Sequence, residues 1–529
     1  MVRREFIKQC GLGATAVATS QSALFANSPK SQKPNFLVIM ADDLSAKDIG
    51  VYGSTDIATP NLDRMAHEGM YFKTGWATPI CSPSRVEILT GRYGFRTGVT
   101  GLVHSAYNCG EWDSSEMFHE QHLTFANVLQ CAGYATAIAG KWQLAGTNIN
   151  VPDQLAQCGF DEHCLWMVSD CYFPANALPK RAAAARYWNS LMMKNGTFLP
   201  TTGSDFGPDI ETDFLIDFAQ RHADGPFCLY YPMTLPHDPI TSTPDPENPG
   251  KRTERSFTSM VRYIDHIVGR LENALANLGV LDNTLIIFTG DNGSSGYGKN
   301  ASEQEKGPRV PFIVKGRGVQ VHDAHDALVD LSDIFPTLAE LAGVSMEGYT
   351  LDGRSFAPIL DNTSPKVRDW IFSYQGGGRW LRDSRYLLDA NGDFWDCGDN
   401  RDEHGYRKID GGAEKERFLE ILRAMPASEI VVSEEKSDWE CGKTRTNKRI
   451  HHAPSGKTVQ MFSNRLVVDA EPGSRHAIRI FAPDGHLVWQ KAGVAPGMTY
   501  LRTRLSKGMY TIRIQNEKAI RTVRQYVVD

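Results

Sequence analysis

The sequence lacks an excess of either charge, and beyond its N-terminus it lacks any long apolar run. Its 56 Lys and Arg residues nearly balance 62 Asp and Glu residues, which leaves a formal net charge of −6. A surface without a basic excess offers no global electrostatic attraction for nucleic acid. No segment after residue 26 approaches the roughly 20 apolar residues of a membrane-spanning helix. These absences argue against a nucleic-acid-binding protein and against a membrane span.

Cysteine is scarce as well, with ten residues in 529. Apart from Cys10 and Cys81, the cysteines are at positions 109, 131, 158, 164, 171, 228, 397 and 441. Their spacing does not fit a zinc site, and it does not determine a disulfide connectivity. In an oxidising compartment some of them would pair, and the closely spaced 158, 164 and 171 are the first candidates.

The N-terminal segment 1–26 has the composition of a targeting signal. Arg3 and Arg4 precede a weakly apolar run, rich in Ala and Gly, that ends near Ala26. This pattern resembles a twin-arginine signal, and such a segment is excluded from the fold. We therefore expect a bacterial protein that is exported to the periplasm or to the outside of the cell.

The part of the chain from residue 34 to residue 367 alternates strand and helix patterns. Short apolar runs at 35–41, 135–140 and 284–293 indicate buried strands, whereas 61–69, 123–133 and 259–279 have helical periodicity. This alternation predicts an α/β fold in which a mixed, largely parallel sheet is sandwiched by helices. Ligands of such sheets bind at the carboxyl ends of the strands.

The C-terminal third shows two further patterns. Residues 368–428 predict short antiparallel strands and one helix, a small α+β subdomain. A polar linker over 429–456 leads to residues 457–529, whose period-two alternation and Pro-Asp-Gly turn predict an appended small β-sandwich. We expect this last domain to serve in sorting or anchoring, in carbohydrate binding, or only in structure.

Two polar pairs follow two of the predicted strands. Asp42 and Asp43 come directly after the first strand, and Asp291 and Asn292 close the run TLIIFTGDNG. Alone, either pair is more often a turn or a helix cap. Together at two strand ends they supply the oxygen ligands that a hard cation such as Ca²⁺ prefers.

The run CSPSR at 81–85, followed by LTGR at 89–92, closely resembles type I sulfatases of the alkaline phosphatase superfamily. The resemblance extends over residues 34–425. It implies that a formylglycine-generating enzyme or an anaerobic maturase oxidises Cys81 to formylglycine, whose hydrate attacks a sulfate ester. It also implies one Ca²⁺ ion held by Asp42, Asp43, Asp291 and Asn292 together with the modified Cys81.

The resemblance carries over four cationic or titratable residues. Arg85 completes the CSPSR run, Lys141 lies in AGKWQLAG, and His237 lies in LPHDPI, where it would protonate the leaving alcohol or contact the sulfate. Lys299 lies in YGKN, but its spacing to the following EKGPRVPF run is one residue longer than in the family, so Lys306 is the alternative. The ordinary state of a lysine is a solvated surface charge.

The function implied is hydrolysis of a sulfate monoester, on a sulfated carbohydrate or polysaccharide. Trp112, Trp166, Trp188 and Tyr297 in predicted loops would suit such a substrate, although aromatic residues more often belong to the core. Two alternatives stay open: a phosphonate or phosphate monoester hydrolase on the same scaffold, and a catalytically silent protein that binds sulfated glycans.

Gln143 departs from the family pattern, which has a His two residues after the Lys of the GKW run. In the family that His takes a proton from the formylglycine hydrate, whereas an amide forms hydrogen bonds but does not titrate. Either Gln143 only orients the hydrate, or another residue acts as the base, or turnover is slow. We expect Gln143→His to hydrolyse an aryl sulfate at a rate equal to or above that of the wild type. A complete loss of activity would show that Gln143 has a specific task of its own.

Overall fold

The computed structural model describes residues 33–103, 122–144, 151–167, 185–401, 403–425 and 439, together with the strands of the C-terminal segment. The predicted signal 1–26 lies outside the described residues, as does the predicted linker 429–456 apart from Trp439. The chain divides into two compact units, with the boundary between Thr444 and Arg445. The predicted division at residue 367 falls inside the first unit and stays a prediction.

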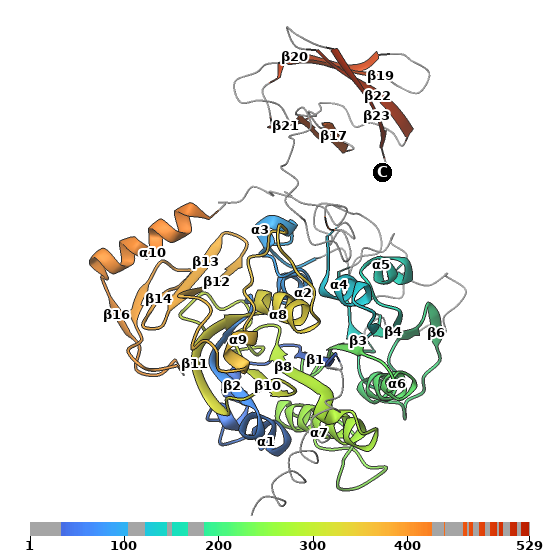
Figure 1. The fold of residues 1–529 in the computed structure, drawn as a ribbon, viewed down its shortest axis with the longest axis vertical. Helices are drawn as coiled ribbons and strands as arrows, with labels where there is room; N and C mark the ends of the chain where they lie inside the picture. The colour runs from blue at the N-terminus through green and yellow to red at the C-terminus, as the bar shows by residue number, and fades with distance from the viewer. Residues whose placement is uncertain are drawn as a thin grey trace, which may run out of the picture. The chain divides into compact units, whose positions relative to one another are not determined.

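The first unit is built on a large mixed sheet (Figure 1). Its strands are β1 (Asn35–Ala41), β2 (Met70–Trp76), β3 (Ala135–Lys141), β4 (Glu162–Trp166), β5 (Met192–Lys194), β6 (Thr197–Leu199), β7 (Phe227–Pro232), β8 (Thr284–Gly290), β9 (Arg309–Val310), β10 (Phe312–Gly316) and β11 (Asp323–Asp330). The spatial order is β11-β2-β10-β8-β1-β7-β3-β4-β5-β6, and β9 pairs with β2. The central strands β8, β1, β7, β3 and β4 run parallel, whereas β10 is antiparallel to both of its neighbours.

Helices cover both faces of this sheet. They are α1 (Pro60–Glu68), α2 (Cys81–Thr90), α3 (Gly94–Thr97), α4 (Phe125–Cys131), α5 (Val151–Gln157), α6 (Gly207–Arg221), α7 (Phe257–Asn277), α8 (Ile334–Leu341) and α9 (Ala357–Leu360), with short 3₁₀ turns η1 (Ala46–Asp48), η2 (Gly50–Tyr52), η6 (Leu281–Asn283) and η7 (Leu331–Asp333). Alternate residues of β1 belong to two separate hydrophobic clusters, one packed with α2, α4 and α8, the other with α1, α6 and α7. The predicted sheet between two helical layers is confirmed.

The observed element boundaries follow local chemistry. β1 matches the predicted strand, but β8 ends at Gly290, so Asp291 and Asn292 lie beyond the last strand residue. Helix α4 begins later than predicted because Thr124 caps it, its side chain accepting a hydrogen bond from the Asn127 amide at 3.2 Å. β1 and β8 both end directly before an acidic residue, Asp42 and Asp291.

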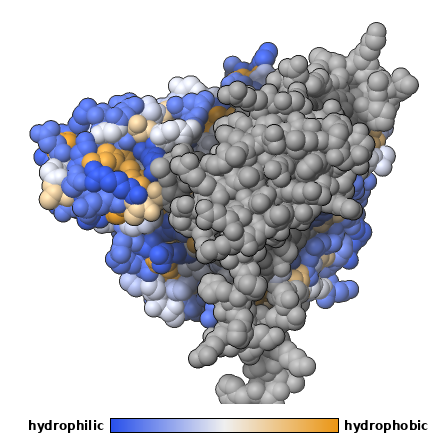
Figure 2. All heavy atoms as spheres, turned by 90° about the horizontal axis from the view of Figure 1, so that it is seen from above, coloured by the Kyte–Doolittle hydropathy of each residue, from blue (hydrophilic) through white to orange (hydrophobic). Residues whose placement is uncertain are grey.

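A second, antiparallel sheet follows in the same unit, as the sequence predicts. It contains β12 (Trp370–Gln375), β13 (Gly378–Asp383), β14 (Tyr386–Leu388), β15 (Phe394–Asp396) and β16 (Arg407–Ile409), and helix α10 (Gly412–Ala424) packs on it through Phe418. Leu419, Ile421 and Leu422 of α10 stay partly exposed. Figure 2 shows apolar side chains at the surface on this side of the molecule, among mostly hydrophilic ones.

A buried ion pair ties this second sheet to the large one. Arg382 on β13 donates to Glu305 at 2.7 Å, and both side chains are fully buried. Glu305 also accepts hydrogen bonds from Trp76 of β2 at 2.8 Å and from Tyr406 at 2.6 Å. Since every oxygen of this buried carboxylate has a donor, the two sheets are held in one arrangement.

The second unit consists of two antiparallel sheets. One contains β17 (Val459–Phe462), β18 (Arg465–Val468) and β21 (Gly497–Tyr500). The other contains β19 (His476–Phe481), β20 (Leu487–Val494), β22 (Gly508–Gln515) and β23 (Ile520–Val527), in the order β20-β19-β22-β23. The predicted strand-rich character of this segment is thus present.

The described cysteines do not pair as the sequence spacing suggests. Cys158 and Cys164 are buried and form no disulfide with each other, whereas Cys131 takes part in a disulfide. Cys158 packs in the cluster on one face of the sheet and Cys164 in the cluster on the other. The sheet therefore lies between the two thiols, which their spacing in the sequence could not predict. Cys171 lies outside the described residues.

Among the described residues, no helix combines the length and the apolar character needed to cross a membrane.

Removal of one partner of the buried ion pair tests the connection between the two sheets. We expect Arg382→Met to lower the free energy of unfolding by about 3 to 5 kcal/mol, because it leaves the Glu305 carboxylate buried without its cation. Denaturant unfolding measures this loss. Arg423→Met is the control, since Arg423 pairs with Glu416 and both side chains are exposed, and it should leave the unfolding midpoint unchanged. Equal midpoints for both variants would contradict the expectation.

Candidate active site

The strand order brings four segments of the chain to one edge of the sheet. Strands β8, β1, β7 and β3 are neighbours in that order, and all four are parallel. Asp291 follows β8, Asp42 and Asp43 follow β1, His237 follows β7, and Lys141 is the last residue of β3. The carboxyl ends of parallel strands meet at one edge, so these side chains lie together.

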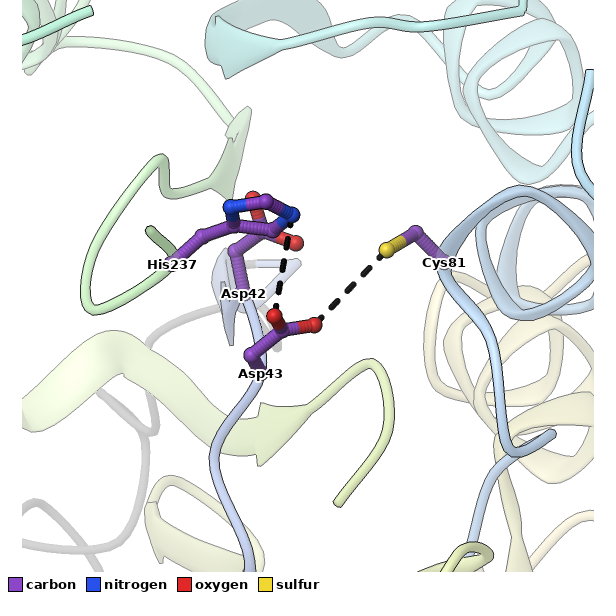
Figure 3. A group of neighbouring side chains, drawn as sticks. All are labelled: Asp42, Asp43, Cys81 and His237. Atoms are coloured by element: carbon purple, nitrogen blue, oxygen red, sulfur yellow. Dashed lines mark hydrogen bonds and ion pairs between the residues drawn. The ribbon is translucent and has the colours of Figure 1, made fainter. Parts of the chain in front are cut away.

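Cys81 is the first residue of α2, and it points into this group. Its Sγ lies 3.8 Å from Asp43 Oδ1, and Figure 3 shows Cys81 and His237 approaching Asp43 from two sides. Pro83 is tolerated because the first turn of a helix has no intrahelical acceptor for its N–H groups. Burial, together with the Asp291 carboxyl, raises the pKa of Cys81 above its ordinary value. The unmodified side chain is therefore a protonated thiol, which is a poor nucleophile.

Arg85 lies one helical turn after Cys81, on the same side of α2. Its Nη2 donates to Asp291 Oδ2 at 2.7 Å and lies 3.3 Å from Asp42 Oδ1. Its Nη1 donates to the Lys141 carbonyl at 3.0 Å. All ten residues of α2 are buried, so the helix that carries Cys81 is held on every side.

Lys141 pairs with Asp42. Its Nζ lies 2.9 Å from each carboxylate oxygen, and both side chains are fully buried. Burial alone would raise the pKa of Asp42, but Lys141, supported by Arg85, holds that pKa well below its ordinary value. Asp42 is therefore an anion under all ordinary conditions.

Asp43 is bound by the loop that follows β8. Its Oδ1 accepts from Asn292 Nδ2 at 2.7 Å, and its Oδ2 accepts from Lys299 Nζ and from Ser295 Oγ, each at 2.8 Å. Its backbone has a φ of 67°, a strained conformation for a residue with a side chain. Such strain at an acidic residue is typical of functional sites.

His237 and Lys299 form a direct pair. His237 Nδ1 lies 2.7 Å from the Asp238 carbonyl, which accepts only from a protonated ring nitrogen. His237 Nε2 therefore accepts the hydrogen bond from Lys299 Nζ at 2.8 Å. Burial lowers the pKa of His237 to about 4, so the ring is neutral and Lys299 holds the proton.

The structure brings Lys299, and not Lys306, to the site. Lys306 pairs with Glu303 at 2.7 Å near the surface. Its carbonyl turns inward instead, against Gly298, where an added Cβ would come within 2.2 Å of the carbonyl oxygen.

Gln143 is buried two residues after Lys141, with its backbone in the left-handed region at a φ of 54°. The structure thus places this amide beside the end of β3, next to the group described above.

Two further residues of the group have no signal in the motifs. Arg186 Nη1 lies 3.4 Å from Asp42 Oδ2, and it comes from a segment without a motif. Ser295 binds Asp43, and only its position two residues after the GDNG run could have indicated it.

The donor set fits a hard divalent cation. Ligand atoms of Asp42, Asp43, Cys81 and His237 all lie within 4.8 Å of one another. Asn292 Oδ1 is buried and has no hydrogen-bond partner in the part of the chain that the structure describes. A buried oxygen without a donor is suited to coordinate a cation. Burial and the nearby Asp42 raise the pKa of Asp291 to about 7, a repulsion that a cation would relieve. Oxygen-rich sites of this kind favour Ca²⁺.

A sequence model of the sulfatase family matches residues 34–344. The chain belongs to the sulfatase family. The predicted family, type I sulfatases of the alkaline phosphatase superfamily, is thereby confirmed, and with it the enzyme class of sulfuric ester hydrolases.

Named sulfatases are similar over most of the first unit. Human N-acetylgalactosamine-6-sulfatase is 32% identical over 372 residues, and the match covers 65% of this chain and 69% of that protein. An N-acetylgalactosamine-6-O-sulfatase of Bacteroides thetaiotaomicron is 30% identical over 385 residues, covering 60% of this chain and 74% of that protein.

Solved structures share the fold of this sulfatase. Ps i-CgsB in complex with k-i-k-neocarrahexaose matches with a TM-score of 0.62 and 25% sequence identity, over 74% of this chain and 92% of that chain. The sulfatase PsFucS1 from Pseudoalteromonas sp. matches in fold with a TM-score of 0.55 and 24% identity, over 75% of this chain and 85% of that chain.

The raised pKa of Asp291 predicts how pH and Ca²⁺ act on stability. In the metal-free protein the folded state keeps a proton on Asp291 up to about pH 7, so this group's contribution to stability falls as pH rises from its ordinary pKa of 3.8 to about 7. Ca²⁺ requires the ionised carboxylate. We therefore expect Ca²⁺ to raise the unfolding temperature, relative to a chelated sample, more at pH 8 than at pH 5.

Asp291→Asn is the control for this measurement. The amide does not titrate, so the variant should lose most of the difference between the two pH values. A shift that is the same at both pH values in the wild type would contradict the expectation.

Proposed function

We propose that this sulfatase hydrolyses sulfate monoesters of a sulfated carbohydrate, with Cys81 converted to formylglycine and one Ca²⁺ ion beside it. The observation that carries the proposal is the position of Cys81. It begins a fully buried helix and lies beside three carboxylates and three cations, which come from the ends of β8, β1 and β3, from the loop after β8 and from the helix itself. A thiol kept protonated by this setting has no evident use there unless it is modified.

The proposed Ca²⁺ ligands are Asp42, Asp43, Asp291 and Asn292, with the modified side chain of residue 81 completing the set. When bound, the ion supplies positive charge for the sulfate oxygens. Formylglycine, once hydrated, supplies two hydroxyl groups on one carbon, one for attack on sulfur and one for the later release of sulfate.

The cationic side chains have separate tasks. Arg85 is fixed by Asp291 and by the Lys141 carbonyl, so it orients the carboxylates and lies one turn below residue 81. Lys141 and Lys299 place positive charge on two sides of the carboxylate pair. Preorganised charges of this kind stabilise the negative charge that spreads over the sulfuryl and leaving oxygens in the transition state.

The Lys299–His237 pair supports a proton route to the leaving alcohol. Lys299 Nζ is protonated and donates a hydrogen bond to His237 Nε2. The imidazole accepts this hydrogen bond and stays neutral. This arrangement makes Lys299 the proton donor and His237 the group that orients it and contacts the substrate. Gln143 then has the role of a hydrogen-bonding residue that orients the hydrate, because its amide takes no proton.

The substrate and the compartment are supported by the relatives and by the sequence. Similar proteins are named for action on N-acetylgalactosamine 6-sulfates, and a structural neighbour binds k-i-k-neocarrahexaose. The disulfide at Cys131 and the signal-like segment 1–26 support export to an oxidising compartment, where disulfides persist. The second unit would then serve sorting, anchoring or carbohydrate binding.

The modification of Cys81 is tested on protein made in a host that contains a maturase. We expect mass spectrometry of the peptide with residue 81 to show the aldehyde, and we expect Cys81→Ser to lower the turnover of p-nitrophenyl sulfate at least a hundredfold. Serine has one hydroxyl where the hydrate has two. Cys228→Ala is the control, because Cys228 is also free and buried but lies away from the site.

Three outcomes decide the proposal. An unmodified Cys81 in active protein, or full activity of Cys81→Ser, would overturn the formylglycine hypothesis. Faster hydrolysis of phosphate or phosphonate esters than of sulfate esters would overturn the proposed substrate class. A folded, unmodified protein that binds sulfated sugars without cleaving them would favour the silent binding protein.

A further inference from the structure

Arg186 lies between the proposed catalytic carboxylates and an aromatic ring. Its Nη1 is 3.4 Å from Asp42 Oδ2, and its guanidinium carbon is 4.3 Å from the centre of the Trp166 ring. The contact with Asp42 is the longest of the three that cations make there, because Lys141 lies at 2.9 Å and Arg85 at 3.3 Å. Lys141 is thus the closest cation to Asp42, and Arg186 lies at the outer side of this carboxylate's set of contacts.

Trp166 supplies a second donor at the same place. It is the last residue of β4 and the register neighbour of Lys141 on β3, so both lie at the edge of the sheet where the site is. Only 4% of Trp166 is exposed, and its indole Nε1 is buried with no hydrogen-bond acceptor among the described residues. A buried N–H group without an acceptor is costly, and tryptophan normally finds one.

A second Arg–Trp pair nearby shows the ordinary arrangement. Arg252 lies 3.5 Å from the centre of the Trp188 ring, and Trp188 Nε1 donates to the Ser242 carbonyl at 2.7 Å. Both donors of that pair have protein acceptors, since Arg252 donates to the Gly203 carbonyl. Trp166 differs because its N–H group has no acceptor among the described residues.

The segment with Arg186 is tied to the loop that carries His237. The hydroxyl of Tyr187 donates to the Thr234 carbonyl at 2.8 Å and also to the His237 carbonyl. Ser190 Oγ donates to the Arg186 carbonyl at 2.9 Å. These bonds fix the backbone of residues 186 and 187 beside the loop that carries His237, and the Arg186 guanidinium lies between Asp42 and the Trp166 ring.

The geometry points to a second oxyanion subsite, in which the Arg186 guanidinium and the Trp166 indole N–H bind another anionic group of the same substrate. This group is a second sulfate or a carboxylate on the sugar that carries the sulfate ester, or on its neighbour. The inference rests on the proposed function, because it assigns the substrate of that site to doubly anionic saccharides.

The test compares substrates with one and two anionic groups. The probes are p-nitrophenyl sulfate, N-acetylgalactosamine 6-sulfate, the corresponding doubly sulfated sugar, and a sulfated disaccharide with a uronic acid. Arg186→Gln should raise KM about tenfold for a doubly anionic probe, the loss expected for one charge-assisted hydrogen bond. Because Arg186 also contacts Asp42, the readout is a ratio: KM should rise several-fold more for the doubly anionic probe than for the singly sulfated probes.

Two further variants separate binding from structure. Trp166→Phe keeps the ring but removes the N–H, and it should raise the same KM in the same direction. Arg186→Lys should restore part of the affinity, because it keeps the charge. Arg252→Gln, on the matched pair, should change no KM. Which probe responds, the doubly sulfated sugar or the uronic acid disaccharide, identifies the anionic group.

Calorimetry with Cys81→Ser gives a readout that does not need turnover. That variant should bind a doubly anionic probe at least tenfold more tightly than the singly sulfated sugar, and Arg186→Gln in the same background should abolish the preference. Equal binding of all probes, or a loss of kcat by the same factor on every probe in Arg186→Gln, would overturn the subsite and leave Arg186 as a structural partner of Asp42. Failure of the wild type to hydrolyse any sulfate ester would instead overturn the proposed function.

Discussion

The active site depends on the burial of three carboxylates at one edge of a parallel sheet. Asp42, Asp43 and Asp291 are all buried, and they end two strands that lie side by side. Taking such charges out of water costs several kcal/mol each unless cations and hydrogen-bond donors surround them. The other functional residues are the groups that meet this cost, so their positions follow from those of the carboxylates.

Helix α2 is the clearest consequence. It carries Cys81 toward the carboxylates and, one turn later, Arg85 that binds two of them. Because the helix is buried on all sides, neither residue has room to move away. The same burial that keeps the Cys81 thiol protonated would hold the proposed formylglycine in a fixed place. One short helix thereby links charge compensation to the chemistry at position 81.

The edge of the site shows where substrate recognition begins. The loop after β8 turns tightly at Gly298 and returns Lys299 to Asp43 and His237, while Lys306 stays outside. On the other side, Arg186 contacts Asp42 and stacks on Trp166, where we propose that a second anionic group of the substrate binds.

Local patterns were enough for the strands, the amphipathic helix α7 and the group around Cys81, because strand ends and the CSPSR run are properties of adjacent residues. The sequence also located the acidic pairs, since both directly follow apolar runs. Only the tertiary structure decided between Lys299 and Lys306, because the choice depends on how a glycine turn folds back. It separated Cys158 from Cys164 by placing them on opposite faces of the sheet. It alone revealed Arg186, because a contact between residues 144 positions apart depends on strand order and leaves no periodicity in the chain.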